Sequence, residues 1–296
     1  MAVIALMITI CASAQLYIYC SDGNVIKVDS ISMIAPEESE QPNPSAGMGV
    51  FSVSADKKVT FSKGNLQYTQ STDTWSFASA QWEMIGTDNV TGGSMSSGDY
   101  KKGTALADKV DLFGWSTATT NFGVNTLGSS SDYSGSFVDW GTNRIGKDAP
   151  NSWRTLSSYE WEYLLNNRPN ASSLKGVARV NGVIGLILLP DSWTCPSGVT
   201  VKSGFLSEYS VEAYGKFQAF SADQWSRLES AGAVFLPAAG LRDGAIFYLV
   251  QYDGLYWSAT GIDSDNAYLL GFRSVEATLG YEDRYYGLSV RLVKDL

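Results

Sequence analysis

Short segments of aromatic and β-branched residues, each bounded by turn residues, recur along the chain and limit the folds that it can adopt. Turn pairs such as Asp56-Lys57 and Lys63-Gly64 separate consecutive segments, which can therefore pair antiparallel. The first segments after residue 49 are Val50–Val53, Val59–Phe61, Asn65–Thr69, Thr74–Ala78 and Gln81–Ile85. This pattern predicts a sheet assembled from many short antiparallel strands.

Two segments carry the start signal of a helix instead. Ser157–Glu160 and Ser221–Gln224 each have a serine followed three residues later by Glu or Gln, the pattern of a capping box. Trp161 and Trp225 begin the apolar stripe after each box and are expected in the core. Gly232 is expected to end the second helix. Strands combined with two helices predict the α+β class.

The N-terminal region has its own organisation. Met1–Ala14 is apolar, is too short to span a bilayer and ends in the A-x-A pattern of a secretory cleavage site. Leu16–Cys20 and Val25–Val28 flank an Asp-Gly turn, which predicts a hairpin that either docks on the main domain or serves as an attachment module. The expected division is a signal peptide (1–14), a β-hairpin (15–34), a linker (35–49) and a main binding domain (50–296).

Two long segments, Asp88–Asp108 and Ser116–Ser136, are rich in Gly, Ser, Thr and Asn and lack hydrophobic periodicity. They are expected to be packed loops around the more apolar Val110–Trp115. None of their glycines follows a strand and opens a helix with the spacing of a phosphate-binding loop.

Charge and histidine content exclude several functions. A formal charge of −9 and a pI near 4.6 argue against nucleic acid as a partner. The chain has no histidine, which rules out Ser-His-Asp catalysis, Cys-His catalysis and histidine-ligated metals. No cofactor and no metal site is expected. Glycoside cleavage by two carboxylates remains open, although no spacing singles out a pair among the 30 acidic residues.

Three cysteines leave alternatives open. Acylation of Cys11 competes with cleavage after Ala14, but the large Ile10 before Cys11 favours the cleavage. The mature chain then keeps Cys20 and Cys195, which either form one disulfide in an oxidising compartment or remain unpaired and buried.

The last forty residues combine strand-forming cores with polar, tyrosine-rich ends. Strands are predicted at Leu255–Thr260, Asn266–Phe272 and Leu288–Val293, with turns at Gly261–Asp265 and Gly280–Arg284. The residues predicted to form the core are Trp257, Phe272, Val290 and Leu292. Tyrosine, arginine and short polar residues are typical of recognition surfaces, so the polar and tyrosine residues of this segment predict an exposed contact face. Its predicted ligand-binding residues are Asp263, Asp265, Asn266, Tyr268, Arg273, Glu276, Tyr281, Asp283, Arg284 and Tyr285. The alternative is a solvated hairpin whose tyrosines lie flat on the sheet.

Several motifs carry a family resemblance. Trp153–Tyr163 (WRTLSSYEWEY) resembles the Arg-Leu-Pro-Thr-x-x-Glu-Trp-Glu-Tyr segment of the formylglycine-generating, or sulfatase-modifying-factor, family. Tyr286–Val293 is similar to that family's closing Gly-Phe-Arg strand. A set of secreted Bacteroidetes proteins resembles the chain over most of residues 15–296, through motifs at Tyr17–Gly23, Phe61–Tyr68, Asp111–Trp115, Leu189–Trp193, Phe235–Gly244 and Tyr256–Ser258.

The resemblance implies a C-type-lectin-like fold, with a twisted antiparallel sheet, two helices and long loops. Similar proteins include targets of diversity-generating retroelements, in which a C-terminal segment is rewritten; that segment would be Trp257–Arg291 here. The family's enzymes use two C-terminal cysteines with copper, and this chain has no cysteine after Cys195, so catalysis is not carried over. The calcium-binding motifs of sugar-binding C-type lectins are missing as well.

These features together predict an exported, non-enzymatic ligand-binding or adhesion protein at the cell surface, in the outer membrane or outside the cell. The expected partner is a protein or glycan, and no transmembrane span is expected in the mature chain. Two rivals remain: a carbohydrate-acting enzyme with paired carboxylates, and a structural subunit of a surface fibre.

Overall fold

The computed structural model describes strands at residues 16–19 and 25–28 together with residues 49–89, 107–115, 135–207, 216–244 and 246–296. The chain divides into two units, Met1–Asn43 and Pro44–Leu296. In the first unit, β1 (Leu16–Tyr19) pairs antiparallel with β2 (Val25–Val28), as the Asp-Gly turn predicts. The predicted signal peptide and most of the predicted linker and long loops lie outside the described residues.

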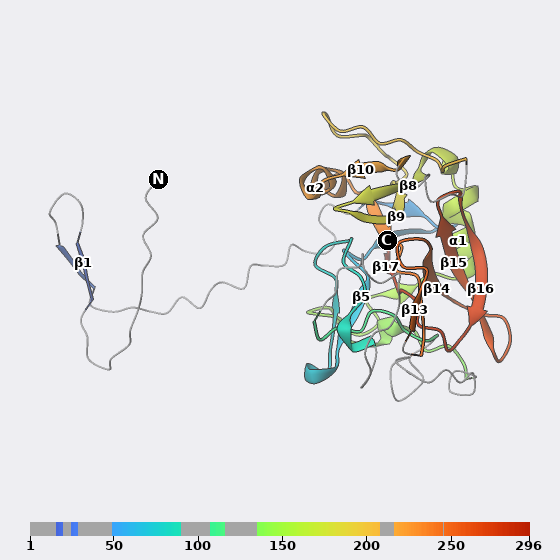
Figure 1. Ribbon diagram of the computed structural model, residues 1–296, viewed down its shortest axis with the longest axis horizontal. Helices are drawn as coiled ribbons and strands as arrows, with labels where there is room; N and C mark the ends of the chain where they lie inside the picture. The colour runs from blue at the N-terminus through green and yellow to red at the C-terminus, as the bar shows by residue number, and fades with distance from the viewer. Residues whose placement is uncertain are drawn as a thin grey trace. The chain divides into compact units, whose positions relative to one another are not determined.

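The second unit consists mainly of short strands, and most of their pairs are antiparallel (Figure 1). The first sheet has the order β3 (Phe51–Ser52), β4 (Lys58–Phe61), β17 (Leu292–Asp295) and β7 (Arg154–Thr155). The second has the order β10 (Gln218–Phe220), β8 (Lys175–Val180), β9 (Val183–Leu188) and β11 (Val234–Pro237), with a parallel β10–β8 pair. The third has the order β14 (Gly254–Gly261), β15 (Asn266–Arg273) and β16 (Glu276–Asp283). Two-stranded pairs are β5 (Leu66–Thr69) with β6 (Thr74–Phe77), and β12 (Leu241–Asp243) with β13 (Ile246–Tyr248). Because β17 pairs with β4, the last strand closes against one of the first strands of the unit.

The described residues contain two short α-helices, α1 (Ser158–Glu162) and α2 (Ala222–Ser230). Both predicted capping boxes are confirmed. Each serine side chain accepts a hydrogen bond from the backbone amide of the Glu or Gln, and the side chain of that Glu or Gln accepts one from the backbone amide of the serine. α1 continues into a π-helical turn, Tyr163–Asn167, and Gly232 follows α2 with a φ of +95°. Mostly antiparallel strands with two short helices confirm the α+β class.

Three clusters of buried side chains form the core of this unit. One contains Trp161 and lies between α1, the first sheet and the inner face of β14–β16. A second surrounds Trp257, and a third surrounds Trp225 under the β8–β11 sheet. All three tryptophans are fully buried, as are Val290 and Leu292, while Phe272 is 3% exposed, so these predicted core positions are confirmed.

Three predicted segments differ from the structure in their secondary structure. Gln81–Ile85 forms no strand. The Gln81 side chain anchors this segment with three hydrogen bonds: it donates to the Glu229 carboxylate and to Ala233 O, and it accepts from Phe235 N. Residues 280–283, predicted as a turn, are the end of β16, because β15 and β16 keep an unbroken register. Residues 287–289 make isolated bridges to three different segments before the regular strand begins at Leu292.

Cys195 is exposed and unbridged, and its thiol donates to Val199 O at 3.3 Å, whereas Cys11 and Cys20 lie outside the described residues. None of the helices in the described part of the chain has both the length and the apolar character needed to cross a membrane.

Candidate functional site

The predicted contact residues gather on the sheet formed by β14, β15 and β16, which we call the C-terminal sheet. In antiparallel pairs, residues that face each other across the ladder point to the same side, and the side alternates along each strand. Tyr256, Leu270 and Phe272 therefore share the inner face, which packs against α1 and the core around Trp161 (Figure 1). The opposite, outer face has both buried and open positions.

On the outer face, the β14 half is covered and the β16 half is open. Leu255, Trp257, Ala267 and Leu269 pack into the cluster around Trp257. Farther along the same face stand Gly271, Arg273, Glu276, Thr278, Gly280 and Glu282. A pocket of about 140 Å³ lies over this open half. Its floor includes Leu255 and Leu269, and its rim carries charged side chains.

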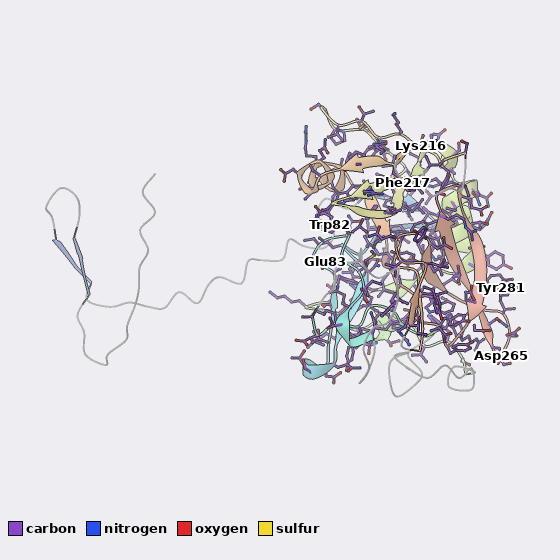
Figure 2. All side chains as sticks on the ribbon, in the orientation of Figure 1. Trp82, Glu83, Lys216, Phe217, Asp265 and Tyr281 are labelled. Atoms are coloured by element: carbon purple, nitrogen blue, oxygen red, sulfur yellow. The ribbon has the colours of Figure 1, made fainter. Side chains whose placement is uncertain are left out.

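The tip of the β14–β15 hairpin is held in one conformation by Asp263. The Asp263 carboxylate oxygen Oδ1 accepts from Asp265 N at 2.8 Å and from Asn266 N at 2.7 Å. These two amides hold the pKa of Asp263 below its usual range. Asp263 is therefore committed to the turn itself, while Asp265 at the tip is exposed and available for contacts (Figure 2).

Arg284 is a correction, because it was predicted on the exposed face and is 94% buried, with an exposed fraction of 6%. Its guanidinium donates to Gly135 O at 3.1 Å, to Asn266 O at 3.2 Å and to Asp263 O. It also lies over the Trp115 ring, 4.2 Å from the ring centroid. Arg284 thus ties the tip of the hairpin to the body of the domain, and no local sequence pattern predicts that its charge is satisfied by backbone carbonyls.

The tyrosines differ in exposure. Tyr281, at 65% exposed, is one of the most exposed large side chains of the described residues and projects outward from β16 (Figure 2). Tyr268 faces it across the ladder and is half-buried, so both tyrosines project to the same side of the sheet as Leu270, opposite the side that carries Arg273 and Glu276. Tyr285 is half-buried beside Tyr286, with ring centroids 4.6 Å apart, and its hydrogen bond to Tyr286 raises its pKa. Asp283 and Asn266, the last residues of the same register, are half-buried too.

Arg273 and Glu276 are exposed, as predicted, and both line the pocket. Arg273 lies 3.9 Å from the Asp253 carboxylate and 3.8 Å from that of Glu276. Sequence reasoning missed Asp253 and Glu282, which also line the pocket. Burial raises the pKa of both carboxyls, and the neighbouring Asp283 raises that of Glu282 further. The signal that could have found this place is glycine inside strands, at Gly271 and Gly280, since such residues often mark a close approach.

The donor set sets limits on the chemistry. Within the described residues, no group of three Cys, Asp or Glu side chains is close enough to hold a metal ion. The pocket instead offers an apolar floor, three carboxylates and one guanidinium, a combination suited to non-covalent recognition. In comparisons with known proteins, no family model, no curated protein and no solved structure matches this chain.

Proposed function

We propose that this chain is an exported, non-enzymatic ligand-binding or adhesion protein that recognises a protein or glycan through the C-terminal sheet and its 262–265 tip. The observation that carries the proposal is the pairing of an exposed tyrosine, Tyr281, with a rigid support. The unbroken β15–β16 ladder, the Asp263 turn and the Arg284 anchor fix the geometry of this sheet and its tip. A surface held in place before binding loses little conformational entropy on binding.

Arg284 acts in this proposal as a positioning residue and not as a contact residue. The turn-forming Asp263 and its partner Asn266 belong to the same supporting framework. The direct contacts are assigned to the residues with accessible side chains, namely Asp265, Tyr268, Arg273, Glu276, Tyr281, Asp283 and Tyr285.

The binding test uses purified full-length protein against a panel of immobilised glycans and cell-surface proteins in biolayer interferometry. We expect Tyr281→Ala and Tyr268→Ala to weaken any specific binding at least tenfold, because exposed aromatic anchors dominate recognition energetics. Tyr248→Ala is the matched control, since Tyr248 is 43% exposed but lies on β13, outside the C-terminal sheet. Equal binding by all three variants would place the ligand elsewhere.

The motif resemblance extends the proposal to a C-type-lectin-like fold and to diversification of Trp257–Arg291. Mostly antiparallel strands and two short helices support the fold. Diversification is tested in the flanking DNA, where a reverse transcriptase gene and a near-copy of the 3′ coding segment, differing mainly at adenines, are expected. Export is tested by N-terminal sequencing of the secreted chain, which should begin at Gln15.

One observation favours a second candidate, a carbohydrate-acting enzyme. Asp253 and Glu282 line one pocket, and burial raises the pKa of both carboxyls, a perturbation that is common among catalytic carboxylates. The test is release of reducing sugar from an oligosaccharide panel. Activity that is lost in both Asp253→Asn and Glu282→Gln would support the enzyme and overturn the binding proposal.

A further inference from the structure

The pocket on the C-terminal sheet exists because two strand residues lack side chains. Gly271 faces Leu255 on β14, and Gly280 faces Leu269 on β15, all on the outer face. A methyl group added to Gly271 would lie 3.4 Å from Leu269 Cδ1 and 3.6 Å from Leu255 Cδ2, and one added to Gly280 would lie 3.4 Å from Leu269 Cδ1. These are ordinary contact distances, so a longer side chain at either position would occupy the pocket.

The rim of the pocket carries an excess of negative charge. Asp253, Glu276 and Glu282 line the pocket with a single cation, Arg273; Arg273 lies close to Asp253 and Glu276, whereas Glu282 stands opposite Ala267 at the other end of β16. Asp253 is 93% buried, with an exposed fraction of 7%, and its Oδ1 has no hydrogen-bond partner among the described residues. The contacts from Arg273 to Asp253 and Glu276, at 3.9 and 3.8 Å, are longer than the roughly 2.7–3.2 Å of a hydrogen bond. A buried carboxylate oxygen without a hydrogen-bond partner is stabilised when a ligand supplies a donor.

We propose that this pocket binds an alkylammonium group, presented as a lysine side chain of a protein ligand; the inference rests on the proposed binding function of the C-terminal sheet. Leu255 and Leu269 would contact the methylene groups of the lysine, and the Asp253 carboxylate would accept a hydrogen bond from its ammonium group. Burial already raises the pKa of Asp253, and a cation bound beside this carboxyl would stabilise its ionised form.

The size and geometry of the pocket select this group over other ligands. Its volume of about 140 Å³ is well below the roughly 300–1,000 Å³ of pockets for whole small molecules, so it fits one side chain. An ammonium is a compact charge with three donors that can turn toward separate carboxylates, whereas a guanidinium is planar and prefers one carboxylate edge-on. In the part of the chain that the structure describes, the acidic side chains do not converge closely enough for a metal ion, which favours an organic cation.

The test is an NMR titration of the labelled full-length protein with n-butylammonium, using n-butanol as the uncharged control. We expect saturable shifts at residues 269–282 with the amine, in the millimolar range typical of so small a ligand, and none with the alcohol. Asp253→Asn should weaken binding at least tenfold, and Asp223→Asn, the matched control at an exposed position on α2, should leave it unchanged. Gly280→Val should fill the pocket and abolish binding, while the space beside Gly280 lets the variant fold.

Equal shifts with amine and alcohol, or unchanged amine binding in Asp253→Asn or Gly280→Val, would overturn the proposal. A second arm compares the blocked tripeptides Gly-Lys-Gly and Gly-norleucine-Gly. Binding of butylammonium without binding of the lysine peptide would identify a free amine and overturn the assignment to a protein side chain. If a panel ligand binds wild type and Gly280→Val equally but loses affinity for Tyr281→Ala, the lysine pocket fails while the proposed function stands.

Discussion

Replacing Arg284 by methionine tests whether the recognition face depends on a buried anchor. Methionine keeps most of the apolar stem over Trp115 but removes the donors to Gly135 O, Asn266 O and Asp263 O. Three hydrogen bonds at about 0.5–1.5 kcal/mol net each, plus about 1 kcal/mol for the cation–π contact, give roughly 2.5–5.5 kcal/mol. Relief of the charge's desolvation, which already lowers the pKa of Arg284, offsets part of this loss.

We therefore expect Arg284→Met to lower the free energy of unfolding by about 2–3 kcal/mol in urea denaturation, and Tm by roughly 4–12 °C. Hydrogen exchange should accelerate at Trp115 N and Arg284 N, whose amides bond Arg284 O and Asp265 O at 2.7 and 2.8 Å. The sequence suggested the reverse, because a contact residue can be replaced without loss of stability.

The matched control is Arg273→Met on the same sheet. The Arg273 side chain is 47% exposed and its ion pairs with Asp253 and Glu276 are long, so its loss should change the free energy of unfolding by less than about 0.5 kcal/mol. If Arg284→Met costs no more than Arg273→Met, the carbonyls regain their hydrogen bonds from water and the anchor argument is wrong.

Three further predictions concern the scaffold. Asp191→Ala should cost about 3–5 kcal/mol in urea denaturation, since it leaves the fully buried Arg168 side chain, 3.1 Å away, without its carboxylate; Asp295→Ala, which removes a 60% exposed partner of an arginine, should cost less than about 1 kcal/mol. Burial raises the pKa of Asp111 to about 6, so the native state binds an extra proton between pH 4 and 6 and loses stability as pH rises through that window. Relative to Asp111→Asn, the free energy of unfolding of the wild type should fall by up to about 3 kcal/mol from pH 4 to 7. A difference between the two proteins that does not change with pH would contradict the assignment. Ser221→Ala removes the N-cap of α2 and should cost about 1 kcal/mol, measured by thermal and urea unfolding, with no loss meaning that water replaces the cap.

Local features of the fold could be predicted because their causes lie within a few residues. A capping box needs only Ser157 and Glu160, or Ser221 and Gln224, and the structure has both. The β1–β2 hairpin follows from an Asp-Gly turn between two short alternating segments. The burial of Trp161, Trp225 and Trp257 follows from side-chain size and apolar surface.

The candidate site could likewise be predicted only in part from the sequence. The sequence marked residues 263–285 as rich in recognition-type side chains, and the structure leaves Tyr281, Asp265, Arg273 and Glu276 exposed there. It did not mark Asp253, because that residue precedes the predicted segment and enters the pocket only when β14 pairs with β15. It also read Gly280 as a turn residue, since a glycine in a strand and one in a turn look alike without the pairing register.

By itself, the sequence determined the α+β class, both helix starts, the N-terminal hairpin and the aromatic core, because each depends on local hydrogen bonding or on apolar surface. Only the tertiary structure decided which polar residues face solvent. Arg284 carries the same side chain as Arg273, yet Arg284 lies among backbone carbonyls contributed by two separate segments, whereas Arg273 is exposed. Whether a charge is buried depends on partners brought together by the whole fold, and no stretch of neighbouring residues encodes that.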